Sequence, residues 1–184
     1  AAPGRGAPAN AVAAVRDATA LVSVMLANNE VGTLQPVADI AAAVDVRVHT
    51  DAAQAVGKIP VDVGTLGVDL LTVAGHKLYA PKGVGALYVR TGCDLPALIP
   101  GASHEGGRRA GTENVAGIVG LGAACALAAD HLEEEVERLQ GLRERLWTGL
   151  AEGLPDTHRH GDPEACLPNT LSIAFPGVVA AVLL

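Results

Sequence analysis

Short apolar segments that end abruptly in polar turn residues dominate the first half of this 184-residue chain. Residues 21–26 form the first segment, and we expect there a strand that is buried on both faces. Pro36 opens a short helix through Val44, because proline is tolerated in a first helical turn. The next strand is expected at 46–49. Strand, helix and strand at this spacing predict right-handed crossovers and a mostly parallel sheet, and so an α/β fold.

Further strands are expected at 68–73 and 85–90, followed by a long glycine-containing loop through residue 111. The stretch 112–150 has a helical pattern, and we predict a break near His131. A polar link at 151–168 then leads to a strand at 169–175 and to a helix that begins near residue 178. From the sequence pattern at its two ends, we expect this chain to be part of a larger fold.

The composition argues against several classes of function. Thirteen Lys and Arg against twenty Asp and Glu give a net charge of −7, whereas nucleic-acid binders carry a basic excess. No run approaches the roughly 18 apolar residues of a membrane span, and residues 1–5 lack the apolar core of a signal peptide. We therefore expect a cytoplasmic protein without nucleic-acid or membrane partners.

The three cysteines are too scattered for a disulfide framework or a metal site, and we expect no bound metal. Cys125 has the surroundings of a packed helical residue, whereas Cys93 and Cys166 stand in expected loops. His158 and His160 are two residues apart, and a surface loop is the simpler interpretation of that spacing. The three consecutive glutamates at 133–135 are interpreted as a solvated helical face.

Polar residues follow three of the expected strands. Asn28-Asn29-Glu30 comes after the first, Asp51 to Gln54 after the second, and Gly75-His76-Lys77 after the third. Ligands bind at this edge of open parallel sheets, so a carboxylate and an amine there indicate a pocket. Periodicity alone leaves open that these charges cap helices or lie on the surface.

Five ordered motifs resemble those of the cysteine desulfurases. They are MLANNEVGT at 25–33, HTDAAQAVGK at 49–58, AGHKLYAPKG at 74–83, RRAGTEN at 108–114 and LPNT at 167–170. The resemblance runs in order from about residue 20 to 175. It implies a pyridoxal-phosphate (PLP) enzyme of the aspartate-aminotransferase fold type. Residues 1–115 would form part of the large PLP-binding domain, 116–164 linking helices, and 165–184 the start of the small C-terminal domain.

The resemblance also implies roles for individual residues. Lys77 would hold the aldehyde of PLP and act as the catalytic base, being preferred among only three lysines because Lys58 and Lys82 do not directly follow a buried strand. Asp51 would pair with the pyridine nitrogen, which makes the ring an electron sink. Gln54 would donate a hydrogen bond to the ring's phenolic oxygen.

The remaining implied contacts surround the ring and its phosphate. Asn29 would orient the ring or the substrate, and His76, also placed among the catalytic residues, would lie beside the phosphate. Thr112 would reach the phosphate of a neighbouring subunit's cofactor in a homodimer; the alternative is that it caps its helix. Arg109 is either a second phosphate contact or a solvated charge, and His104 is expected to be structural.

The sequence departs from the family pattern in ways that bear on cofactor affinity. Ala74 stands where many relatives carry a phosphate-binding serine, and the 101–107 segment lacks an arginine. The family's upstream phosphate loop and ring-stacking histidine would precede residue 1. Its nucleophilic cysteine would follow residue 184, and none of the three cysteines is expected to replace it. We therefore expect the 184 residues alone to release little or no sulfide.

The implied activity is removal of sulfur from L-cysteine to give L-alanine and an enzyme-bound persulfide. The sulfur would pass to an acceptor protein such as an iron–sulfur cluster scaffold. Two alternatives stay open on the sequence: a selenocysteine lyase, which shares these motifs, and a non-catalytic fragment that binds a partner.

Overall fold

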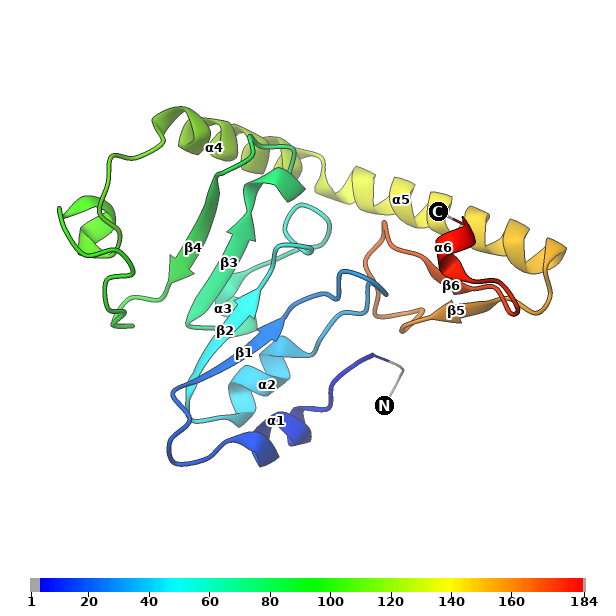
Figure 1. The fold of residues 1–184 in the computed structure, drawn as a ribbon, viewed down its shortest axis with the longest axis horizontal. Coiled ribbons are helices and arrows are strands. Elements are labelled where there is room, and N and C mark those ends of the chain that lie inside the picture. Colours follow the sequence, from blue (N-terminus) through cyan, green and yellow to red (C-terminus); the bar gives the residue numbers. More distant parts are fainter. Residues whose placement is uncertain (1–3, 184) are drawn as a thin grey trace.

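Parallel pairing aligns three of the four strands of the main sheet. The structure is a computed structural model that describes residues 4–183 (Figure 1). Strand order follows the sequence, with β1–β2 and β2–β3 parallel and β3–β4 antiparallel. The strands are β1 (Leu21–Met25), β2 (Arg47–Asp51), β3 (Leu70–Ala74) and β4 (Gly85–Val89). The predicted α/β class with a mostly parallel sheet is confirmed, and each predicted strand lies within three residues of its observed bounds.

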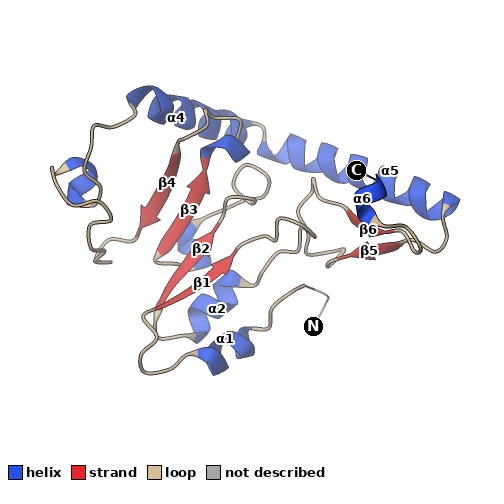
Figure 2. Ribbon diagram, in the orientation of Figure 1, coloured by secondary structure: helices blue, strands red, loops and turns tan. Residues whose placement is uncertain are grey.

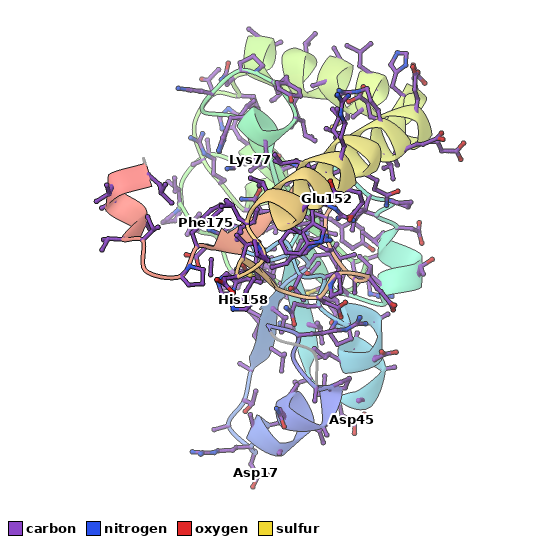
Figure 3. All side chains as sticks on the ribbon, turned by 90° about the vertical axis from the view of Figure 1, so that its right-hand side faces the viewer. Asp17, Asp45, Lys77, Glu152, His158 and Phe175 are labelled. Carbon is purple, nitrogen blue, oxygen red and sulfur yellow. The ribbon has the colours of Figure 1, made fainter. Side chains whose placement is uncertain are left out.

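Helices α2 (Val37–Ala43) and α3 (Val63–Leu66) lie on the same side of this sheet, and α1 (Pro8–Ala14) packs against α2. Figure 3, in which the sheet is turned edge-on, shows this one-sided arrangement. Buried side chains from α2, β2 and β3 meet the loop residue Leu167 in the main core, namely Val37, Val48, Leu71 and Leu167. Burial of this apolar surface holds the sheet and its helices together.

The expectation that the first strand is buried on both faces was wrong. Val22 and Val24 pack against the core, but Leu21 and Met25 point to the other face and are 43% and 38% exposed. Side chains alternate along a strand, and β1 is an edge strand whose core packing is on one face among the described residues. Its apolar side chains therefore do not indicate two covered faces.

Two long helices follow the sheet, α4 (Val115–Asp130) and α5 (Leu132–Gly153). They meet at His131 with a bend of 71°, which confirms the predicted break. Within residues 4–183 neither helix alone is long and apolar enough to span a membrane, and the two satisfy that test only as a bent pair.

A small antiparallel sheet lies beside α5 (Figure 2). It pairs β5 (His158–His160) with β6 (Ser172–Ala174), so the predicted link at 151–168 contains a strand and the predicted strand at 169–175 is shorter. The guanidinium of Arg143 in α5 donates to the carbonyl oxygen of Leu167 at 2.7 Å. That side chain is only 9% exposed, so α5 is fixed to the loop before β6. The other short helical turns are η1 (Gly75–Lys77), η2 (His104–Gly107) and α6 (Ala180–Leu183).

Close packing at Gly75 fixes the turn that follows β3. The amide of Gly75 donates to the carbonyl oxygen of Val84 at 3.1 Å, and its own carbonyl accepts from Leu78 and Ala80. A Cβ atom on Gly75 would lie 2.6 Å from that Val84 oxygen, closer than contact allows. Only glycine fits between the end of β3 and the strand that returns beside it.

We therefore predict that Gly75→Ala destabilises the fold by about 1–3 kcal/mol, the range typical of overpacking. Gly141→Ala is the matched control, because a Cβ on Gly141 meets nothing within 4 Å and its helix gains about 0.5–1 kcal/mol from alanine. Urea unfolding followed by circular dichroism measures both changes. Equal effects of the two substitutions would contradict this account of the turn.

Candidate functional site

The carboxyl ends of β1, β2 and β3 meet at one edge of the sheet, as parallel pairing requires. Backbone hydrogen bonds continue past the strand ends: Leu26 donates to the carbonyl of Asp51 at 2.8 Å, and Ala52 donates to that of Thr72 at 3.1 Å. The three turns that carry the predicted site residues therefore start from a fixed frame.

The turn after β1 separates the roles of two neighbouring asparagines. The side-chain oxygen of Asn28 accepts from the backbone amides of Glu30 and Val31 at 2.8 and 2.9 Å. Asn28 thus shapes the turn, as asparagine does when it bonds its own backbone. The next residue, Asn29, is exposed. Its amide is available to a ligand at the sheet edge, the position predicted for it.

Asp51 is the last residue of β2, and Gln54 lies in the turn that follows. One carboxylate oxygen of Asp51 accepts from the amide of Ala53 at 2.9 Å, which orients the side chain and leaves the other oxygen for a partner. Asp51 is exposed and Gln54 is half-buried, while Ala52 between them is fully buried. The buried alanine anchors this turn to the core.

Lys77 is held in a similar way, between two buried residues. Gly75 is enclosed at the end of β3, and Leu78 packs with Ala80 against Leu121 of α4. His76 and Lys77 lie between these anchors with exposed side chains, at the turn that Figure 3 labels. The backbone is fixed on both sides of an amine that is free to reach a ligand.

Tyr79 completes this turn in an unusual conformation. Its φ is +63° and its side chain is fully exposed. A positive φ is uncommon for residues other than glycine, and strained backbone of this kind concentrates at functional sites. The strain lies two residues from Lys77.

Lys58 is a partner of Lys77 that the sequence did not reveal. Its Nζ donates to the carbonyl oxygen of Lys77 at 3.4 Å. Burial, and after it the charge of Lys77, lowers the pKa of the Lys58 ammonium below its ordinary value. Lys58 was set aside as the cofactor lysine because it does not follow a strand. Spacing alone gave no signal that its turn lies against the Lys77 turn.

A cavity of about 690 Å³ lies between these turns and the junction of α4 and α5. Lys58 and Lys77 line it from the sheet side, and His131 and Arg138 line it from the helices. Glu135 also lines the cavity and pairs with Arg138 through two hydrogen bonds of 2.9 and 2.7 Å. Glu135 therefore lines this cavity while its side chain stays 46% exposed, in keeping with the interpretation of residues 133–135 as a solvated face.

Asn169 belongs to the LPNT motif, for which the sequence suggested no role, and it lines the same cavity. Two residues before it stands Leu167, whose carbonyl accepts from Arg143. That contact fixes the loop that brings Asn169 into the lining of the cavity that Lys77 also lines.

Thr112 does not line the cavity and is exposed in the segment before α4. The cap of that helix is Asn114, whose side chain accepts from Gly117 at 3.1 Å, so the alternative role of Thr112 as a cap was wrong. Arg109 is exposed and donates to the carbonyl of Gly111 at 3.3 Å. His104 is half-buried, and its Nδ1 has no protein partner within the described residues.

The cysteines do not join the site. Cys166 is buried beside the turn after β1, and Cys125 packs at the cluster that anchors Leu78. Cys93 follows β4, which runs antiparallel to β3, so it lies beyond the opposite edge of the sheet from Lys77. Within residues 4–183, no three His, Cys, Asp or Glu side chains are placed to hold a metal ion.

Comparison with known proteins identifies the family. The model of the family described as Aminotransferase class-V matches residues 2–183. The chain belongs to the class-V aminotransferase family. Among class-V relatives, a cysteine desulfurase of Gluconacetobacter diazotrophicus is 50% identical over 169 residues, which are 90% of this chain and 42% of that protein.

Solved structures give the same result. A NifS-like protein is 41% identical with a TM-score of 0.92, over 98% of this chain and 50% of its own. A structure described as SspA in complex with cysteine is 33% identical with a TM-score of 0.76, over 94% of this chain and 48% of its own. This class-V chain thus spans about half the length of the relatives it matches.

The environment of Lys58 leads to a prediction. Amines react with acylating reagents only when deprotonated, so a lowered pKa moves the half-maximal labelling rate to lower pH. We expect the Lys58 midpoint to lie below 10.5, its ordinary value, and Lys77→Met to raise it partway, because the charge of Lys77 is lost while burial remains. Mass spectrometry of trace-labelled peptides across pH 7–11 would measure this. An unchanged midpoint in the variant would contradict the coupling.

Proposed function

We propose that this chain forms part of the PLP-binding core of a cysteine desulfurase. The observation that carries the proposal is the placement of an amine, a carboxylate and an amide, from Lys77, Asp51 and Gln54, at the carboxyl ends of adjacent parallel strands. The names of the relatives, cysteine desulfurase and NifS-like protein, support the same activity.

The donor set fits PLP chemically. The cofactor has an aldehyde that needs an amine, a pyridine nitrogen that needs a carboxylate, and a phenolic oxygen that accepts a hydrogen bond. Lys77, Asp51 and Gln54 supply one of each. When bound, PLP would act as an electron sink for the carbanion formed at the α-carbon of the substrate amino acid.

Lys77 would hold the aldehyde and then move protons at the substrate. Its backbone, fixed between buried Gly75 and Leu78, would let the amine swing without displacing the turn. Lys58, which donates to the carbonyl of Lys77, would add a further restraint on that backbone.

Asp51 would keep a proton on the ring nitrogen through the carboxylate oxygen that Ala53 leaves free. Gln54 would donate from its amide nitrogen to the phenolic oxygen. Asn29 would orient the ring or the substrate, and His76 would lie beside the phosphate. Thr112 would reach the phosphate of a neighbouring subunit's cofactor, as the family resemblance implies, and its exposed position before α4 leaves it accessible to such a subunit, so we propose a homodimer.

The proposed substrate is L-cysteine, the molecule named in the SspA complex. The products would be L-alanine and a persulfide on a cysteine thiol, from which the sulfur passes to an acceptor such as an iron–sulfur scaffold in the cytoplasm. Burial of Cys166, helix packing of Cys125 and the position of Cys93 at the opposite sheet edge argue against these three as the thiol.

The first test is whether Lys77 holds the cofactor. We expect PLP added to the intact protein to give an absorption band that borohydride fixes as a label on the peptide containing Lys77. Lys77→Ala should abolish the band and the label. Lys82→Ala is the matched control, because Lys82 is exposed and outside the cavity lining. A label on Lys58 or Lys82 in the unsubstituted protein would contradict the assignment.

A further inference from the structure

Three polar side chains form a hydrogen-bonded chain across the sheet. Nδ1 of His49 lies 2.8 Å from Oγ of Ser23, and Nε2 of His49 lies 2.7 Å from Oγ1 of Thr72. The three residues belong to β2, β1 and β3 in turn. One imidazole therefore connects all three parallel strands through their side chains.

These three hydrogen-bonded side chains lie on the face of the sheet to which Asp51 points. His49 and Asp51 are two residues apart on β2, so their side chains point to the same face. The register sets Ser23 opposite His49 and Thr72 opposite Asp51. The opposite face is the packed one, where Val48 and Thr50 are buried.

The chemistry of the three groups suits a permanent connection. A neutral imidazole donates from one nitrogen and accepts at the other, and each hydroxyl can do either. Both hydrogen bonds therefore form in either tautomer of His49. Arg47, the charged residue on the other side of His49 along the same face, donates to the carbonyl of Asp94 and so is held at the far edge.

Two backbone hydrogen bonds on either side of Asp51 lie directly beyond the side-chain bonds of His49. They run from Leu26 to the carbonyl of Asp51 and from Ala52 to that of Thr72. Any spreading of β1 or β3 away from β2 would break them and move the carboxylate. Side-chain bonds just before the strand ends oppose that spreading.

We propose that His49 is a positioning residue, which binds Ser23 and Thr72 to hold the carboxyl ends of the three strands together and thereby fixes Asp51 for the cofactor ring. The part that concerns the ring rests on the proposed function. The part that concerns the strands does not, and it is tested without PLP.

The experiment compares variants of the intact protein by hydrogen exchange at the amides of Leu26 and Ala52 without PLP, and by titration with PLP. His49→Phe and Thr72→Val remove the bonds, whereas Thr72→Ser keeps the hydroxyl. Thr50→Val is the matched control, because Thr50 connects β2 to β1 through the carbonyl of Val24 on the packed face.

We expect His49→Phe and Thr72→Val to speed exchange at both amides roughly fivefold, the equivalent of one net hydrogen bond, and to weaken PLP binding by a similar factor. Thr72→Ser should keep the exchange rates and the PLP affinity of the unsubstituted protein. Thr50→Val should lower the urea midpoint without a selective effect on these amides or on PLP affinity.

Two outcomes would overturn the proposal: exchange that is unchanged in His49→Phe, or Thr50→Val variants that match His49→Phe at both amides and in PLP affinity. Faster exchange with unaltered PLP affinity would overturn the link to Asp51. Failure of the unsubstituted protein to bind PLP would count against the proposed function, while the exchange rates would still decide the strand connection.

Discussion

The hydrogen bonds between parallel strands are the constraint on which the site depends. Because of them, β1, β2 and β3 run in the same direction. Two further backbone bonds, from Leu26 to Asp51 and from Ala52 to Thr72, extend the pairing past the strand ends. Functional groups more than twenty residues apart in sequence reach one edge because of this pairing. The side chains at that edge need little structure of their own.

Two of the turns at that edge are secured by a small buried residue close to a functional one. Ala52 is buried beside Asp51, and Gly75 is buried two residues before Lys77. Because the anchors have little or no side chain, the backbone comes close to its neighbours while the functional groups stay exposed. The buried residues thus fix the backbone, while the exposed functional side chains stay free to move.

Local patterns predicted the four strands of the main sheet, its mostly parallel order and the break at His131, because apolar runs and turn formers leave direct traces in sequence, whereas β5 in the polar link was missed. Exposure of the outer face of β1, seen at Leu21, could not be predicted, since apolar side chains look alike whether or not a layer covers them. The contact of Lys58 with Lys77 and the place of Glu135 in the cavity lining depend on how separate elements pack, which spacing does not encode. The domain boundaries and the roles of Asp51 and the other site residues stay predictions.

The bend at His131 has a geometric consequence for the sheet edge. Leu78, next to Lys77, packs on Leu121 of α4, whereas Leu167, held by Arg143 of α5, donates to the carbonyl of Gly32 in the turn that carries Asn29. The turn that carries the Lys77 amine is therefore packed against α4, and the turn that carries the Asn29 amide is connected to α5 through Leu167. The bend of 71° between α4 and α5 therefore has to match the separation of the two turns that the sheet sets.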